Sequence, residues 1–100
     1  MENNFPINLK ITYGVPLVRL RELHNLEYGE AEMPITRRIK TQMVNDGLCG
    51  GMGRAVDDYS RIVPFLNEQS ANYYSTELVR RMDLIIKYPE INPKFEILRD

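Results

Sequence analysis

The chain has little of what several protein classes require. Cys49 is its only cysteine, which excludes an intramolecular disulfide and a cysteine-based metal cluster and fits a reducing compartment. The net charge of −1 excludes a global attraction to nucleic acid or to an anionic membrane. No apolar run approaches the roughly 18 residues of a membrane span, and residues 1–6 lack the basic and apolar regions of a secretion signal. We therefore expect a cytoplasmic protein with no membrane partner.

The composition is that of one soluble globular domain. The chain has 100 residues, of which 43% are hydrophobic and 27% are charged, so it has enough apolar surface for one core. No internal repeat or low-complexity segment divides it. We expect a single domain that spans residues 1–100.

Three stretches carry the apolar spacing of an amphipathic helix. The spacing predicts helices over residues 16–27, over residues 34–45 and over a last stretch that ends at Lys87, capped by Ser70 or Asn72. The supporting apolar residues are Leu17, Leu20 and Leu23, then Ile35, Ile39 and Met43, and finally Tyr74, Leu78, Met82, Ile85 and Ile86. A strand at residues 17–20 is the alternative for the first stretch.

Two short segments near the termini, residues 5–11 and 95–98, alternate between apolar and polar residues, as half-buried strands do. Pro6 has no backbone N–H to donate, which favours an edge strand or a loose start to the strand, and we expect the two strands to pair. The resulting fold is mainly α, a compact bundle of three to four helices with short edge strands near both termini. An α+β arrangement is the alternative. Terminal strands with open edges favour a homo-oligomer.

Four of the six glycines lie between Gly47 and Gly53. Glycine loses more conformational freedom on folding than any other residue, so the cluster indicates a close backbone approach, either to a neighbouring helix or to a bound anion. We expect a further helix to begin near Leu48 and to end before Pro64, with a loop over residues 47–53 as the alternative. The pattern matches neither the P-loop nor the dinucleotide fingerprint, so close packing is favoured over an anion site.

Basic and aromatic residues flank the glycine cluster. The planar fork of arginine suits a phosphate, and a tyrosine ring offers a base a face on which to stack. The sequence thus offers a pocket for a nucleotide or another phosphorylated small molecule. Its candidate ligand-binding residues are Arg37, Arg38, Lys40, Gly50, Gly51, Gly53, Arg54, Tyr59, Tyr73 and Tyr74, with Arg61 also able to approach. The alternative is that the arginines keep helix surfaces soluble.

The sequence holds no catalytic constellation. Cys49 and His24 are the residue types of a nucleophile and its base, but nothing in their spacing brings them together, and a lone cysteine beside Leu48 is typical of a small buried apolar residue. Zinc requires about four ligands, and only scattered carboxylates remain for it. We expect a protein that is not an enzyme and that has no metal and no cofactor.

The segment that begins Gly47-Leu48-Cys49, in a small chain without catalytic residues, resembles small phage-encoded proteins of the host-takeover or anti-defence kind. The resemblance implies a protein that binds a host protein or sequesters a nucleotide-type signal, and it identifies no residue. We expect a non-catalytic binding protein whose partner is a host protein or a phosphorylated small molecule. A repressor-like regulator that binds nucleic acid is the alternative, which the net charge does not favour.

Overall fold

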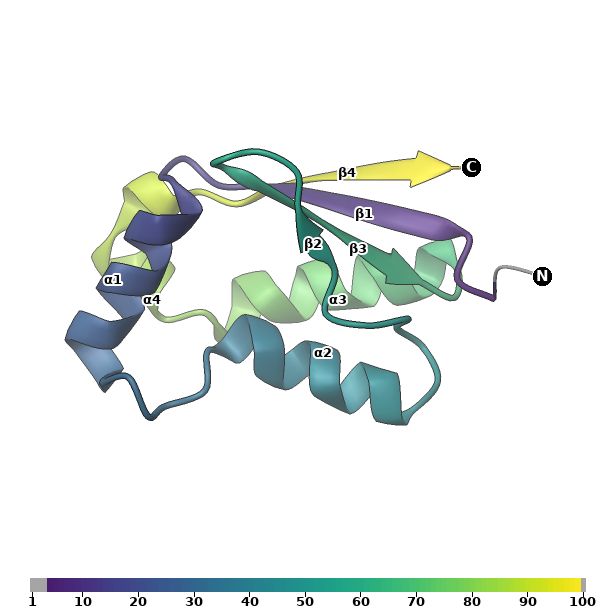
Figure 1. The fold of residues 1–100 in the computed structure, drawn as a ribbon, viewed down its shortest axis with the longest axis horizontal. Helices are drawn as coiled ribbons and strands as arrows, with labels where there is room; N and C mark the ends of the chain where they lie inside the picture. The colour runs from purple at the N-terminus through teal and green to yellow at the C-terminus, as the bar shows by residue number, and fades with distance from the viewer. Residues whose placement is uncertain (1–3, 100) are drawn as a thin grey trace.

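A computed structural model describes residues 4–99, which form a four-stranded sheet with helices on one face (Figure 1). The elements are β1 (Ile7–Thr12), α1 (Leu17–Tyr28), α2 (Ile35–Asn45), β2 (Arg54–Ala55), β3 (Ser60–Phe65), α3 (Glu68–Arg81), α4 (Leu84–Lys87), the 3-10 helix η1 (Pro89–Ile91) and β4 (Lys94–Arg99). The strands are antiparallel in the order β2-β3-β1-β4. This element order and strand order are those of the ferredoxin-like topology.

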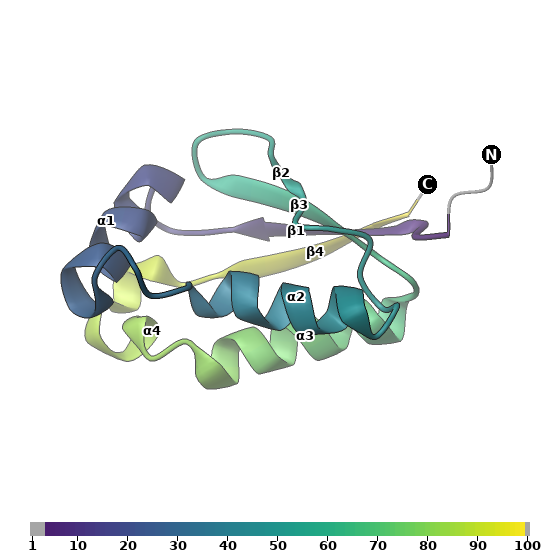
Figure 2. The ribbon, with the colours of Figure 1, turned by 60° about the horizontal axis from the view of Figure 1, so that its bottom comes forward.

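The register of β1 decides which side chains enter the core. Leu9 lies opposite Val63 on β3 and Ile97 on β4, so the three side chains share one face of the sheet. That face lies against α2 and α3, which run side by side beneath the sheet (Figure 2). Leu9 and Val63 are accordingly almost completely buried. No helix covers the opposite face in either view of residues 4–99.

The prediction of a mainly α bundle is wrong, because the protein is α+β. The first strand is also not at an edge. Pro6 precedes β1, which begins at Ile7, so its missing N–H does not interrupt the ladder and β1 pairs on both sides. The predicted pairing of the two terminal strands is confirmed, with Ile7 opposite Arg99 and Thr12 opposite Lys94.

The predicted helix from Leu48 to Val63 is also wrong. This part of the chain forms turns, the short strand β2 and most of the central strand β3. Pro64 is tolerated inside β3 because its carbonyl oxygen accepts from the Gly50 N–H at 2.9 Å, on the side away from β1. The N and C=O of one strand residue point to the same side, so the missing N–H of Pro64 leaves the β1 ladder intact.

The other helix predictions hold with one change of boundary. Helices over residues 16–27 and 34–45 are confirmed as α1 and α2, which excludes a strand at residues 17–20. The last predicted helix divides into α3 and α4 after Arg81. Its cap is neither Ser70 nor Asn72 but Asn67, whose Oδ1 accepts from the Ser70 N–H at 2.8 Å.

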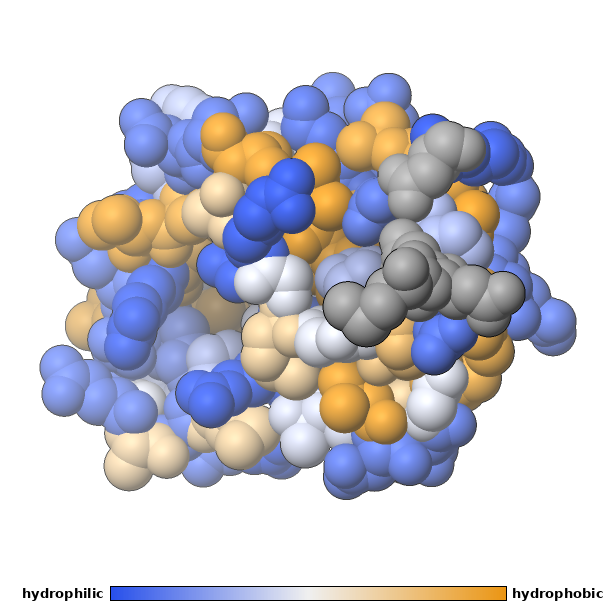
Figure 3. All heavy atoms as spheres, turned by 45° about the vertical axis from the view of Figure 1, so that its right-hand side comes forward, coloured by the Kyte–Doolittle hydropathy of each residue, from blue (hydrophilic) through white to orange (hydrophobic). Residues whose placement is uncertain are grey.

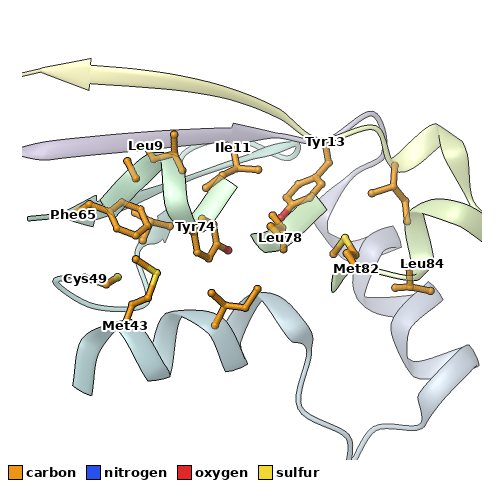
Figure 4. Close-up of a cluster of buried hydrophobic side chains, with 14 of the residues drawn as sticks. Leu9, Ile11, Tyr13, Met43, Cys49, Phe65, Tyr74, Leu78, Met82 and Leu84 are labelled. Carbon is orange, nitrogen blue, oxygen red and sulfur yellow. The ribbon is translucent and has the colours of Figure 1, made fainter. Parts of the chain in front are cut away.

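One apolar core fills the space between the sheet and the helices (Figure 4). At its centre the Phe65 ring from β3 lies 5.4 Å from the Tyr74 ring of α3. Helices α1 and α4 lie together at one end of the molecule, where Glu27 accepts from Lys87 at 2.9 Å and from the Tyr88 hydroxyl at 2.8 Å. Among residues 4–99, no helix combines the length and the apolar character needed to cross a membrane.

Candidate functional site

Helix α2 and strand β3 each direct one cationic side chain into the interior. Lys40 follows Ile39 on the buried side of α2 and is 5% exposed, and its Nζ donates to the Met52 carbonyl oxygen at 3.0 Å. Arg61 lies opposite Ile11, on the helix-covered face of the sheet. Its Nη2 donates to the Gly53 carbonyl oxygen at 3.2 Å, while its buried Nε has no hydrogen-bond partner. We call these two side chains the basic pair.

The basic pair has no counter-charge. The ion pairs within residues 4–99 involve neither Lys40 nor Arg61. A buried cation without a carboxylate destabilises a fold, because it loses water without gaining a negative partner. Uncharged carbonyl oxygens are the acceptors observed here. The positive charges of the pair therefore lack a negative partner, which a bound anion would supply.

Three consecutive backbone carbonyl groups face the interior donors. The Cys49 Sγ donates to the Gly51 oxygen at 3.1 Å, and the basic pair donates to the next two, those of Met52 and Gly53. We call residues 51–53 the carbonyl segment. It joins the turn after α2 to β2.

Gly53 explains why this segment is rich in glycine. Its φ is +79°, and a Cβ atom at this position would lie 2.3 Å from the Ile62 carbonyl oxygen. Only glycine combines that backbone conformation with that proximity. The close approach predicted from the cluster is confirmed here, although the neighbouring backbone belongs to strand β3 and not to a helix. Gly51 differs, because its φ is +151° but an added Cβ would meet nothing within 4 Å.

Burial and the repulsion between cations shift the pKa values of the side chains in and around the basic pair. Burial, reinforced by the positive charge of Arg61, lowers the pKa of Lys40 to about 8. Burial raises the pKa of the Cys49 thiol. It also raises the pKa values of Tyr13 and Tyr74, against the opposing effect of Arg61. Both tyrosines point their hydroxyl groups into the interior, one from the end of β1 and the other from α3 (Figure 4). They are therefore neutral phenols near Arg61 at physiological pH.

Five of the ten predicted ligand-binding residues belong to the basic pair or the carbonyl segment or lie beside them. Lys40 is one member of the basic pair, and Gly51 and Gly53 belong to the carbonyl segment. Gly50 precedes the carbonyl segment, where an added Cβ would be 2.8 Å from the Phe5 ring. The Tyr74 ring is buried in the adjacent core.

The other predicted residues are dispersed. Arg37 is exposed, although its charge contributes to lowering the pKa of Lys40, and Arg38 is turned outward into an ion pair with Glu32 at 2.6 Å. Arg54 lies opposite Ile62, on the uncovered face of the sheet. Exposed Tyr59 and Tyr73 line two separate shallow grooves, with Pro16 to Val18 in the first and Gln69 in the second. No shared aromatic pocket forms from these tyrosines.

The inward direction of Arg61 and the part played by Tyr13 were not predicted from the sequence. The feature of the sequence that indicates both is the alternation of side chains between the two faces of a strand. Arg61, Val63 and Phe65 alternate in the same way as Leu9, Ile11 and Tyr13, and strand periodicity places each set on one face. Reading residues 48–63 as a helix removed that signal.

Other kinds of site receive less support from residues 4–99. Within this range, no group of three or more His, Cys, Asp and Glu side chains is arranged to hold a metal ion. The face shown in Figure 3 has a hollow, and its apolar residues are dispersed in small groups among hydrophilic ones. A broad apolar patch, the usual mark of a protein-binding surface, is not seen on that face.

Comparison of the chain with family models, with curated proteins and with solved structures finds no match. The ferredoxin-like topology serves many unrelated functions, so the fold assigns none by itself. The basic pair and its surroundings are therefore the features that indicate a function.

Proposed function

We propose that the protein binds a small anionic ligand through a phosphoryl group at the basic pair, Lys40 and Arg61. The observation that carries this proposal is that a buried lysine and a half-buried arginine, whose Nε is buried and unpartnered, lie close together without a carboxylate. A ligand anion would offset the cost of burying them, and the unpartnered Nε of Arg61 offers it a charge-assisted hydrogen bond.

A phosphoryl group fits the donor set better than a single carboxylate. It carries up to two negative charges and three acceptor oxygens, which suits two cations and nearby phenol groups. Arg37 adds a third positive charge close enough to influence Lys40. The ligand class is therefore a phosphorylated small molecule, with nucleotides included.

Binding is favoured over catalysis by the state of Cys49. A reactive cysteine has a lowered pKa, whereas burial raises the pKa of this thiol. His24, the other half of a cysteine–histidine pair, lies on α1, where its Nε2 forms a hydrogen bond with the Glu32 carbonyl oxygen at 2.8 Å. These contacts support a protein that holds its ligand without transforming it.

The nucleic-acid alternative receives less support from the uncovered face of the sheet. Proteins that bind single-stranded nucleic acid on such a face stack bases on aromatic side chains. The residues of this face on β1, β3 and β4 include no aromatic side chain: they are Asn8, Lys10, Thr12, Ser60, Ile62, Pro64, Lys94, Glu96 and Leu98. The anti-defence role and the homo-oligomer stay predictions. A phosphoryl site suits sequestration of a nucleotide-type signal better than capture of a host protein.

The test is isothermal titration with pyrophosphate as the probe. We expect the wild-type protein to bind it and Lys40→Gln and Arg61→Gln to bind at least about tenfold more weakly, the loss typical of a hydrogen bond to a charged group. Arg38→Gln is the matched control, because it removes one positive charge from the exposed side of the same helix and should bind as the wild type does. Far-UV circular dichroism checks that each variant folds. Equal losses in all three variants, or no binding to the wild type or to any variant of it, would contradict the proposal.

A further inference from the structure

The Lys40 side of the basic pair is closed off by the backbone of the chain itself, whereas Arg61 is half-buried. Lys40 is 5% exposed, and its Nζ uses one of its three N–H donors for the Met52 carbonyl oxygen, which lies over it. A phosphoryl group cannot contact this nitrogen while the carbonyl segment remains in place. If the proposed function is correct, on which this inference rests, ligand binding requires residues 51–53 to move.

We infer that the carbonyl segment is a displaceable lid whose oxygens stand in for those of the ligand. In the closed state the Met52 and Gly53 oxygens accept from the basic pair, and in the bound state phosphoryl oxygens replace them. The exchange is favourable because a hydrogen bond between a cation and a full anion is stronger than one between a cation and a neutral carbonyl group.

The contacts on either side of the lid confine this movement. Before it, the Gly50 N–H donates to the Pro64 carbonyl oxygen at 2.9 Å. After it, Arg54 begins β2 and pairs with β3. Glycine on each side of Met52 allows the large dihedral changes that a hinge requires. The moving part is therefore about three residues long, and the sheet and α2 keep their positions.

A closed lid lowers the apparent affinity for ligand, because only the open fraction of molecules binds. Any change that strains the closed lid should therefore tighten binding. Gly51→Ala is such a change, since φ of +151° is unfavourable for alanine while the added Cβ meets nothing within 4 Å. The substitution strains the closed backbone without filling the site.

The experiment compares pyrophosphate titrations of the wild type, Gly51→Ala and the matched control Gly29→Ala. Gly29 has a φ of +87° and also has open space around its Cβ position, but it lies at the end of α1. We expect Gly51→Ala to bind at least about fivefold more tightly, the lower end of the effect of a strained φ/ψ region, and Gly29→Ala to bind as the wild type does. In the wild type, the NMR amide signals of residues 51–54 should show the largest shifts on addition of pyrophosphate.

The outcomes separate the lid from the site. Binding that depends on Lys40 but is unchanged or weakened in Gly51→Ala, with unmoved signals for residues 51–54, would overturn the lid and leave the proposed function standing. No binding by either the wild type or Gly51→Ala would overturn both. Binding by Gly51→Ala alone would support the lid, because it is the closed segment that blocks the wild-type site. Should Gly51→Ala fail to fold, the wild-type amide shifts decide the question.

Discussion

Lys40 donates from its ammonium group to the Met52 carbonyl oxygen over 3.0 Å, and a neutral acceptor thus occupies the place that a carboxylate usually takes beside a buried lysine. The contact joins α2 to the glycine-rich connection that leads to β2. Because the acceptor is neutral, it does not compensate the positive charge. Burial therefore lowers the pKa of Lys40 to about 8. Both the stability of the protein and its affinity for anions should therefore depend on pH above neutrality.

Lys40→Met should remove an alkaline rise in stability. The pKa of Lys40 is 10.5 in its ordinary state and about 8 in the folded protein. Between these values the unfolded chain holds a proton that the folded chain has released, so the wild-type free energy of unfolding rises with pH relative to the variant, by up to about 3 kcal/mol. Urea unfolding of both proteins from pH 7 to pH 10 measures this difference. The buried tyrosines titrate in both proteins, and a difference that stays constant with pH would contradict the expectation.

Anion affinity should fall as Lys40 loses its charge. Sulfate is a suitable probe because it keeps its two negative charges throughout the alkaline range. We expect wild-type affinity for sulfate to drop at least about tenfold between pH 7 and pH 9.5, since the lysine pKa of about 8 lies within that interval. Lys40→Met should bind weakly at every pH. Calorimetric titration gives both series, and a wild-type affinity independent of pH would exclude Lys40 as an anion ligand.

Gly14→Ala should destabilise the end of β1. A Cβ atom on Gly14 would lie 2.2 Å from the Glu90 carbonyl oxygen, where the Gly14 N–H also donates to the Ile91 oxygen at 2.8 Å. Because backbone must shift to relieve this overlap, we expect a loss of about 2 kcal/mol or more in the free energy of unfolding. Gly29→Ala, which adds strain without overlap, should cost about 1 kcal/mol. Denaturant titrations measure both free energies of unfolding. A smaller loss in Gly14→Ala than in Gly29→Ala would show that η1 shifts at little cost and would contradict the expectation.

Asn67→Ala should weaken the start of α3. Asn67 Oδ1 accepts from both the N–H and the hydroxyl of Ser70 at 2.8 Å, and loss of such a cap costs about 1 kcal/mol. Asn72→Ala is the matched control, because Asn72 is exposed within α3 and alanine has the higher helix propensity there. Thermal unfolding should show a lower midpoint for the first variant only. A larger fall of the unfolding midpoint in Asn72→Ala would contradict this expectation and favour Asn72, one of the two caps predicted from the sequence.

The parts of the fold predicted correctly depend on local information. Helices α1 and α2 follow from apolar spacing bounded by Pro16, Pro34 and Gly47, since proline and glycine act on the backbone at their own positions. The terminal strands follow from alternation over residues 5–11 and 95–98. The basic residues of α2 and the unusual backbone of the glycine cluster were likewise visible without a structure.

The sequence by itself determined which residues carry charge, which segments alternate and where the backbone turns. Only the tertiary structure decided that Ser60–Phe65 is a strand, because its apolar residues fit either period until pairing with β1 supplies the hydrogen bonds. That pairing turns Arg61 inward toward α2, and the carbonyl segment then covers it together with Lys40. The site therefore depends on contacts between residues distant in the chain, whose burial and hydrogen bonding no local pattern specifies.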